Sequence, residues 1–211
     1  MLILLLGPPG VGKGTQGERL AQALGVPKIA TGDVLRAAVK AGTPHGLAAK
    51  AAMERGDLVP DEVILGILKD VLAAPETANG ALFDGVVRTV PQAEGMCAML
   101  ASLGRSLDLV MFFDAPADEL VRRLSGRTTC EKCQTPYAGR EPGTTCDKCG
   151  GKLVRRADDD PASVRRRIEV YEKQTSPVTA WYRAHGPRVA TIDAVGSFDE
   201  IAARAHAALG T

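Results

Sequence analysis

The residues with the clearest chemical potential form a glycine-rich turn, Gly7-Pro-Pro-Gly-Val-Gly-Lys-Gly-Thr15. An apolar run precedes the turn at residues 2–6, and a helical pattern through Leu20 and Leu24 follows it. In the order strand, turn and helix, glycines let backbone N–H groups converge on phosphate oxygens, and Lys13 adds a mobile positive charge. The turn therefore predicts a phosphate-binding loop; a glycine turn without a ligand is the alternative interpretation.

Four cysteines form two C-x-x-C pairs, Cys130 with Cys133 and Cys146 with Cys149. The spacing C-x₂-C-x₁₂-C-x₂-C is close to that of a zinc ribbon, and four thiolates would fill a tetrahedral Zn²⁺ site. Free or disulfide-linked cysteines are the alternative, and they suit a reducing compartment less well. Because a closed four-thiolate site leaves no position for substrate, we expect a structural metal.

Arginines gather on both sides of the cysteine segment, at residues 122, 123 and 127 before it and at residues 155, 156 and 165–167 after it. For most of them a solvated basic face is the alternative interpretation. Arg167 is different, because Val164, Ile168 and Tyr171 mark the inward stripe of a helix and Arg167 lies beside that stripe. An inward arginine needs an anionic partner.

Two aspartates near the ends of predicted strands, Asp84 and Asp33, are candidates for holding Mg²⁺. Asp84 ends the strand candidate at residues 81–84, where its carboxylate could orient the water shell of Mg²⁺, which dehydrates reluctantly. A turn or cap aspartate is the alternative for Asp84. Asp33 could assist there, or it could simply be an aspartate in the first turn of a helix.

The pattern along the chain alternates between short apolar runs and helical periodicity, which predicts an α/β fold with a parallel sheet. We expect strands at residues 2–6, 28–30, 81–84, 109–113 and 188–193. We expect helix starts at Asp160-Pro161 and Ser176-Pro177, and a capping box from Ser197 to Glu200. Residues 31–59 and 126–160 do not fit the alternation and are interpreted as insertions.

The 211-residue chain, 45% hydrophobic, is long enough for one such domain with insertions. Its formal net charge of +1 provides no general basic field, so no nucleic-acid partner is expected. No apolar stretch approaches the roughly 20 residues of a membrane span, and no secretory signal is recognisable. We therefore expect a protein of the reducing cytoplasm with no membrane partner.

A set of motifs covers nearly the whole chain in order: "GPPGVGKGTQ" at 7–16, "IATGDVLR" at 29–36, "GDLVPDE" at 56–62, "LFDG" at 82–85, "RT" at 88–89, "QAE" at 92–94 and "RADDD" at 156–160. With these motifs the chain resembles the nucleoside monophosphate kinases, and most closely the adenylate kinases with a long, zinc-bearing lid. The offset of the hydroxyl to Thr15, one residue after Gly14, is part of that likeness.

The resemblance implies a P-loop kinase core with a five-stranded parallel sheet flanked by helices, plus a helical monophosphate-binding insertion and a zinc-ribbon-like lid. The corresponding boundaries are 1–30, 60–125 and 161–211 for the core, 31–59 for the insertion and 126–160 for the lid. It also implies transfer of a phosphoryl group from Mg-ATP to AMP, which gives two ADP and balances the adenine nucleotides. Since two arms must swing, we expect a monomer.

The resemblance further implies roles for individual residues. ATP would be bound by Gly10, Val11, Gly12, Lys13, Gly14, Thr15, Arg123, Arg127, Pro136, Tyr137 and Gly196. AMP would be bound by Thr31, Arg36, Asp57, Leu58, Val59, Gly85, Arg88, Gln92, Arg156 and Arg167. The catalytic group would be Lys13, Arg88, Arg123, Arg127, Arg156, Arg167 and Asp84.

One motif departs from the family pattern, because Val86 and Val87 stand where these kinases usually have Phe-Pro, often with a cis peptide. A cis bond without proline costs about 2.5–4 kcal/mol, so we predict a trans peptide and a modest change in the direction of the Arg88 side chain.

Two other functions remain as alternatives. One is a kinase for another nucleoside monophosphate; the other is a zinc-ribbon nucleic-acid binder, which would leave Lys13 and Arg167 unexplained.

Overall fold

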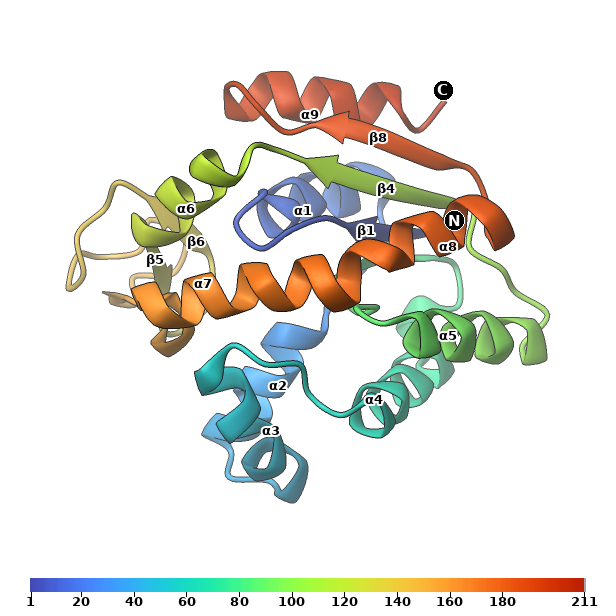
Figure 1. Ribbon diagram of the computed structural model, residues 1–211, viewed down its shortest axis with the longest axis horizontal. Helices are drawn as coiled ribbons and strands as arrows, with labels where there is room; N and C mark the ends of the chain where they lie inside the picture. Colours follow the sequence, from blue (N-terminus) through green and yellow to red (C-terminus); the bar gives the residue numbers. More distant parts are fainter. Residues whose placement is uncertain (211) are drawn as a thin grey trace.

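The computed structural model describes residues 1–210, except the side chains of residues 44, 45 and 48. Its centre is a parallel sheet of five strands in the order β2-β3-β1-β4-β8 (Figure 1). The strands are β1 (Leu2–Leu6), β2 (Lys28–Ala30), β3 (Ala81–Asp84), β4 (Leu109–Asp114) and β8 (Val189–Asp193). Within the described residues, no helix combines the length and the apolar character needed to cross a membrane.

Helices cover both faces of this sheet, because alternate residues of each strand point to opposite sides. Ile3 and Leu5 of β1 pack in one apolar cluster and Leu2, Leu4 and Leu6 in the other. The first cluster includes residues of α1 (Lys13–Leu24), α6 (Ala117–Ser125) and α9 (Phe198–Ala207). The second includes residues of α4 (Asp61–Ala73), α5 (Val90–Ser102) and α8 (Ser176–His185).

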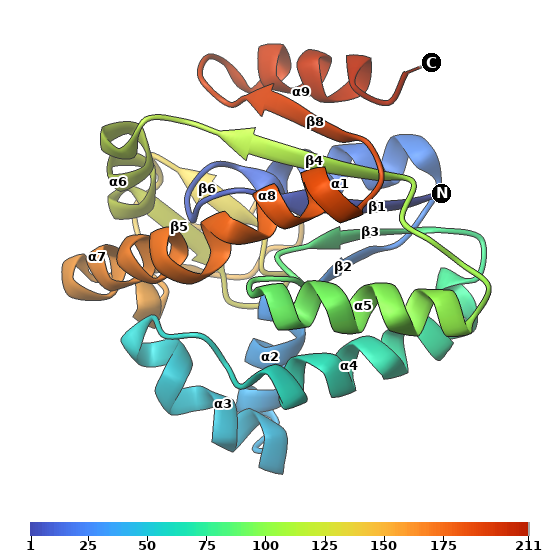
Figure 2. The same ribbon diagram turned by 45° about the vertical axis from the view of Figure 1, so that its right-hand side comes forward.

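Two segments project from the core (Figures 1 and 2). The first carries helices α2 (Thr31–Lys40) and α3 (Pro44–Arg55), as expected for the insertion at 31–59. The second carries a small antiparallel sheet in the order β6-β5-β7, from β5 (Arg127–Cys130), β6 (Pro136–Ala138) and β7 (Leu153–Val154). We call these segments the insertion and the lid.

One long helical rod crosses the front of the molecule between the two projecting segments (Figure 1). The rod consists of α7 (Pro161–Val170), the π-helical turn η3 (Tyr171–Thr175) and α8. Elsewhere in the chain there are two 3-10 turns, η1 (Pro75–Thr77) and η2 (Ala157–Asp159). The Asp160 side chain accepts from the N–H groups of Ala162 and Ser163, so the predicted start of α7 is confirmed. The rod places Arg167 between the insertion and the lid.

The sequence predictions for these elements are largely confirmed. The first three strands have the predicted bounds, and the last two differ by one residue each at Asp114 and Arg188. The capping box from Ser197 to Glu200 is present. A helix, α8, does begin at Ser176 with Pro177 in its first turn, as predicted, but Ser176 is not its N-cap, because Ser176 has helical backbone angles and continues the rod from η3. Pro177 has no N–H to donate a helical hydrogen bond, and the wider π-helical turn before it accommodates the missing bond.

Parallel strands bring their carboxyl ends to one edge of the sheet. The register pairs Leu5 with Asp84 and Ala30 with Asp84, so the segments after β1, β2 and β3 start side by side. These segments are the glycine turn, α2 and the stretch beginning at Gly85. Ligands of open α/β sheets bind outside this edge.

Candidate active site and metal centre

A cleft of about 940 Å³ opens at this edge, between the core, the insertion and the lid. Residues from every motif that carries the family resemblance line it, and the described structure brings all the predicted nucleotide residues together. They are Gly10, Val11, Gly12, Lys13, Gly14, Thr15, Thr31, Arg36, Asp57, Leu58, Val59, Asp84, Gly85, Arg88, Gln92, Arg123, Arg127, Pro136, Tyr137, Arg156, Arg167 and Gly196. The second acidic candidate, Asp33, also lines it.

The glycine turn wraps around the start of α1. Gly10 and Gly12 have φ angles of 84° and 99°, a left-handed backbone that L side chains rarely adopt. A Cβ at Gly10 would also lie 2.8 Å from Leu124 Cγ. The turn ends at Lys13, where α1 begins. The Thr15 N–H donates back to Gly12 O at 3.1 Å, whereas in the described structure no backbone acceptor pairs with the N–H groups of Lys13 and Gly14. They are available to an anion in the cleft.

The Lys13 ammonium lies inside the turn, where it donates to Gly7 O at 2.7 Å and to Pro8 O at 3.0 Å. Burial lowers its pKa from 10.5 to about 8, although the nearby Asp84 carboxylate acts in the opposite direction. Asp84 approaches from β3: a Cβ on Gly14 would lie 3.3 Å from Asp84 Oδ2. Gly14 therefore leaves room for that carboxylate near the Lys13 ammonium.

On the insertion side, the first helical turn of α2 pairs Asp33 with Arg36. Thr31 Oγ1 donates to Gly85 O at 2.9 Å, which fixes the start of α2 against the segment after β3. Arg88 Nε also donates to Gly85 O, at 3.1 Å. Arg88 is exposed toward the cleft, yet desolvation by the surrounding protein and the positive charge of Arg167 lower its pKa. A bound anion at this position would balance these positive charges.

Gln92 is 1% exposed, and much of its amide is already engaged. Its Oε1 accepts the Arg88 N–H at 2.7 Å, and its Nε2 donates to Asp61 Oδ1 at 2.7 Å. One lone pair and one N–H remain for a ligand. The Gln92 side chain therefore holds the backbone of Arg88 in place at the wall of the cleft.

The peptide between Val86 and Val87 follows the prediction, because no cis peptide bond occurs in the described chain. Both valines are buried, at 1% exposure each. They pack in the same apolar cluster as β1 and α5, so they anchor the segment from which Arg88 projects.

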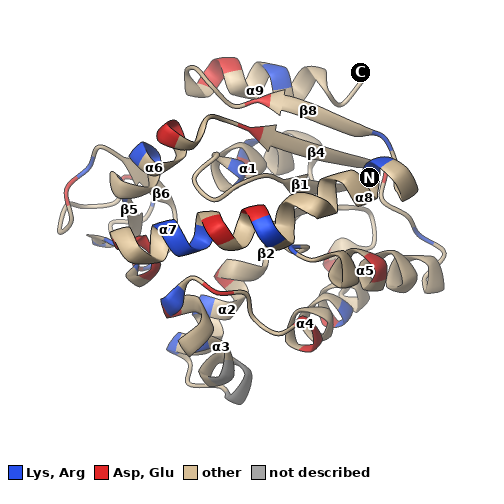
Figure 3. Cartoon of the chain, viewed as in Figure 1, with Lys and Arg blue, Asp and Glu red and all other residues tan. Residues whose placement is uncertain are grey.

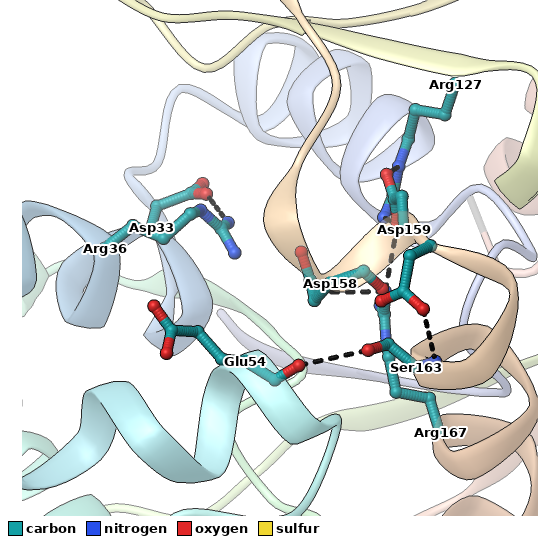
Figure 4. Close-up of polar contacts among 9 residues, drawn as sticks. Asp33, Arg36, Glu54, Arg127, Asp158, Asp159, Ser163 and Arg167 are labelled. Carbon is teal, nitrogen blue, oxygen red and sulfur yellow. Dashed lines mark hydrogen bonds and ion pairs between the residues drawn. The ribbon is translucent and has the colours of Figure 1, made fainter.

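Five of the arginines that flank the cysteine segment line the cleft: Arg122, Arg123, Arg127, Arg156 and Arg167. Figure 4 shows the acidic partners of Arg127 and Arg167. Arg127 forms a two-pronged pair with Asp159, and Arg167 Nη1 contacts Asp159 Oδ1 at 3.1 Å and Asp158 Oδ2 at 3.0 Å. Arg123 donates to Glu119 at 2.7 Å and to Ala194 O at 2.9 Å. Arg166 does not line the cleft, and its guanidinium contacts Asp57 Oδ1 at 2.8 Å.

Positive charge is crowded at the point where these side chains meet. Burial and the charges of Arg36 and Arg127 lower the pKa of Arg156 to about 10, and its buried Nε has no partner. Burial alone would raise the pKa of Asp158, but Arg167, Arg127, Arg156 and Arg36 bring it below the usual value. A site with this surplus of guanidinium groups is built for a multiply charged anion.

The four cysteines meet in the lid, where their sulfur atoms all lie within 4.8 Å of one another. The Sγ–Sγ separations are 3.5 Å (Cys130–Cys149), 3.6 Å (Cys133–Cys146) and 3.8 Å (Cys146–Cys149). A tetrahedron with metal–sulfur bonds near 2.3 Å has sulfur atoms about 3.8 Å apart, whereas a disulfide bond is near 2.05 Å. The donor set and spacing therefore fit a structural metal site.

Sequence reasoning did not assign roles to Asp158, Asp159 and Glu119, which hold the arginines in place. A signal was present for the first two, because three consecutive aspartates follow Arg156 in "RADDD". Glu119 lies four residues before Arg123 on α6, a spacing that pairs side chains on one helix face.

Comparisons with known proteins give a consistent result. The family model described as "Adenylate kinase" matches residues 5–187. The chain is 64% identical over 211 residues to an adenylate kinase of Gemmatimonas aurantiaca, and the match covers 99% of both chains. It is 45% identical over 205 residues to an adenylate kinase of Thermodesulfovibrio yellowstonii, covering 95% of both. It is 48% identical over 213 residues to one of Acidothermus cellulolyticus, covering 99% of this chain and 98% of that one.

Proposed function

The chain belongs to the adenylate kinase family, and from that premise we propose how its cleft transfers a phosphoryl group between Mg-ATP and AMP to give two ADP. The observation that carries the proposal is the convergence of Lys13 and the arginines at positions 36, 88, 123, 127, 156 and 167 on one cleft. These cations come from widely separated segments of a chain whose net charge is only +1. Figure 3 shows basic and acidic residues distributed over most elements.

The ATP phosphates lie in the glycine turn, Gly10 to Thr15, against the N-terminus of α1. Its free N–H groups and the Lys13 ammonium neutralise the phosphate charge. Pro136 and Tyr137 of the lid and Gly196 after β8 line the far part of the cleft and contact the adenine base. Arg123 and Arg127 connect the two parts and grip the triphosphate.

AMP lies on the insertion side of the cleft. Arg36 and Arg88 clamp its phosphate, while Thr31, Gln92 and the stretch Asp57 to Val59 surround its base and ribose, with Gly85 at the strand end. Gln92 can discriminate the base, because its amide keeps one donor and one acceptor. Arg156 and Arg167 stand between the two nucleotides.

The obstacle to transfer is repulsion between two anionic molecules. Two unit charges about 4 Å apart interact by roughly 4 kcal/mol at an effective dielectric near 20, and several such pairs are brought together here. The converging guanidinium groups offset this repulsion and hold donor and acceptor in line. No general base is required, since the acceptor phosphate has a second pKa of about 6 and is already ionised near neutrality.

Asp84 would hold Mg²⁺ through its water shell, and the room that Gly14 leaves for the Asp84 carboxylate fits that role. Mg²⁺ supplies charge neutralisation at the phosphate oxygens of ATP. Asp33 is the weaker candidate, because its carboxylate is paired with Arg36.

In the lid, we propose Zn²⁺ as the metal of Cys130, Cys133, Cys146 and Cys149. Buried apolar residues of the lid are few, with Leu153 and the cysteines forming its small core. Metal binding therefore supplies the free energy that keeps residues 126–160 folded while this segment moves. Four reduced thiolates suit the cytoplasm, and we propose that the protein acts there as a monomer with no nucleic-acid partner.

A phosphoryl-transfer assay with Mg-ATP and AMP, GMP, CMP or UMP tests the proposed acceptor. We expect a strong preference for AMP, and a preference for any other base would reject AMP as the substrate. Lys13→Ala serves as the chemical control: it should abolish turnover while the thermal unfolding curve stays close to that of the parent. Retained turnover would contradict the role of Lys13.

A further inference from the structure

Tyr137 belongs to two sites at once. It is the middle residue of β6, and it lines the cleft next to Pro136 on the side assigned to the base of ATP. Its hydroxyl lies 3.2 Å from Sγ of Cys146, one of the four metal ligands. A single rigid side chain thus spans the distance between the nucleotide cleft and the metal centre.

The direction of the Tyr137–Cys146 hydrogen bond follows from the neighbouring contacts. The Asp147 N–H donates to Tyr137 Oη at 3.1 Å, which leaves the hydroxyl hydrogen free for another acceptor. A thiolate bound to a metal carries no proton, so Cys146 can only accept. Tyr137 therefore donates to the metal-bound sulfur.

The Tyr137 ring also contacts a side chain that is held by the residues on either side of Cys146. The Arg140 guanidinium lies 5.4 Å from the ring centroid. Arg140 is itself held by Asp147 at 2.7 Å and by Thr145 O at 2.9 Å, on either side of Cys146. Both the hydroxyl and the ring face of Tyr137 are thus positioned by residues 145–147.

We propose that Tyr137 is a positioning residue that couples occupancy of the metal centre to binding of the ATP base. The bound metal holds Cys146, Cys146 holds the hydroxyl, and the ring presents a fixed surface to the base. Coupling between two sites is reciprocal, so ATP must strengthen metal binding by the factor by which the metal strengthens ATP binding. This inference rests on the proposed contact between Tyr137 and the base of ATP.

Thr135 provides a matched control. Its Oγ1 lies 3.2 Å from Sγ of Cys133, so it also makes a hydrogen bond to a metal ligand. Unlike Tyr137, Thr135 is not among the described residues that line the cleft. Thr135→Val and Tyr137→Phe each remove one hydroxyl next to a thiolate, and only the second removes the connection to the cleft.

The experiment uses the whole chain with Co²⁺ in the four-thiolate site, because the sulfur-to-metal charge-transfer band reports hydrogen bonding to the sulfurs. A β,γ-imido analogue of ATP should shift this band in the parent and in Thr135→Val, and should leave it unchanged in Tyr137→Phe. AMP alone should not shift it in any of the three proteins. Competition with a chelator should show metal affinity about tenfold lower for Tyr137→Phe.

Calorimetric titration with the same analogue separates the possible failures. If the analogue does not bind the parent protein at all, the proposed function fails. If it binds the parent without shifting the band, or shifts it equally in Tyr137→Phe, the coupling is overturned while the proposed function stands. The parent measurement decides the matter even if Tyr137→Phe does not fold.

Discussion

At the level of single residues, charge placement dominates this protein. Asp159 has a side chain only 2% exposed, and it contacts both Arg127 and Arg167. Its carboxylate fixes two guanidinium groups that face the same cleft. Such a residue stabilises the fold and the geometry of the site together, and the two effects can be separated by experiment.

We expect Asp159→Asn to reduce stability by about 1–3 kcal/mol, because the buried arginines lose a charged acceptor. Turnover should fall by a factor on the order of 100, since both arginines lose their fixed positions. Thermal unfolding and steady-state rates measure the two effects. Asp199→Asn is the control, because Asp199 is exposed and pairs with Arg19 at 2.7 Å; an equal loss of turnover there would contradict the assignment.

The pH dependence of ATP use should report Lys13. Its pKa is about 8 in the protein, below the ordinary 10.5, so the ammonium loses its proton as pH rises through 8. We therefore expect kcat/KM for Mg-ATP to fall above about pH 8, because that parameter follows the free enzyme. The corresponding fall in kcat should occur at higher pH, because bound phosphates stabilise the protonated form of Lys13. A flat kcat/KM up to pH 10 would contradict this.

The sequence was sufficient to identify the site residues that belong to short, contiguous motifs. The glycine turn and the paired cysteines are short motifs, so their spacing alone indicated phosphate and metal binding. The partners of Arg127 and Arg167 were missed, because a pair such as Arg127 with Asp159 joins residues that only the folded lid brings together. Likewise, nothing in the chain indicated that Gln92 would already be bound to Asp61.

At the level of elements, two glycines in helices should respond oppositely to alanine. Gly66 is exposed within α4, and a Cβ there would meet nothing within 4 Å. Gly66→Ala should therefore stabilise the protein by up to about 1 kcal/mol. Gly17 of α1 faces the sheet, where a Cβ would lie 2.9 Å from Leu5 Cδ1, so Gly17→Ala should destabilise it. Denaturant titration compares them; stabilisation by both would contradict the packing.

Metal removal should act on the lid as an element. Because the buried lid core is little more than Leu153 and the cysteines, we expect chelation to lower the unfolding temperature by about 5 °C or more. Hydrogen exchange should accelerate in residues 127–154 and stay slow in β1 and β4. If exchange and the melting curve are unchanged after metal analysis shows complete removal, the structural role of the metal is excluded.

Strand positions were predictable because strands buried on both faces appear as continuous apolar runs. The rod formed by α7, η3 and α8 was not predicted as one unit, because Ser176-Pro177 has the local signature of a helix start. Packing of Val178 and Tyr182 against the core keeps the chain helical past the proline. Tertiary contacts thus overruled a local signal.

At the level of the whole molecule, ion pairs hold both projecting segments against their neighbours. On the lid side, Lys148 contacts Glu18 of α1 at 3.0 Å, and Glu18 also meets Lys28 at 3.2 Å. On the insertion side, Asp57 pairs with Arg166, and Ser163 Oγ donates to Glu54 O at 3.0 Å. Under the proposed function, these contacts join segments that separate to admit nucleotides.

We expect Lys148→Gln to raise KM for ATP by up to about fivefold, because an exposed ion pair contributes little and is weakened by salt. Added salt should raise the parent's KM toward that of the variant. Steady-state kinetics at two ionic strengths provide the measurement, with Lys173→Gln, whose pair with Glu169 lies within the rod, as the control. Equal salt dependence in parent and variant would contradict a closing role.

The two ends of the lid are hydrogen-bonded neighbours, since β5 pairs with β7 through Thr129 with Val154 and Cys130 with Leu153. A segment that leaves and re-enters a protein at one point can be exchanged without redirecting the chain on either side. The lid is therefore a natural unit for grafting and for independent evolutionary change. A replacement stabilised by hydrophobic packing alone could occupy the same junction, and the folding of that segment would then require none of the metal proposed for the four cysteines.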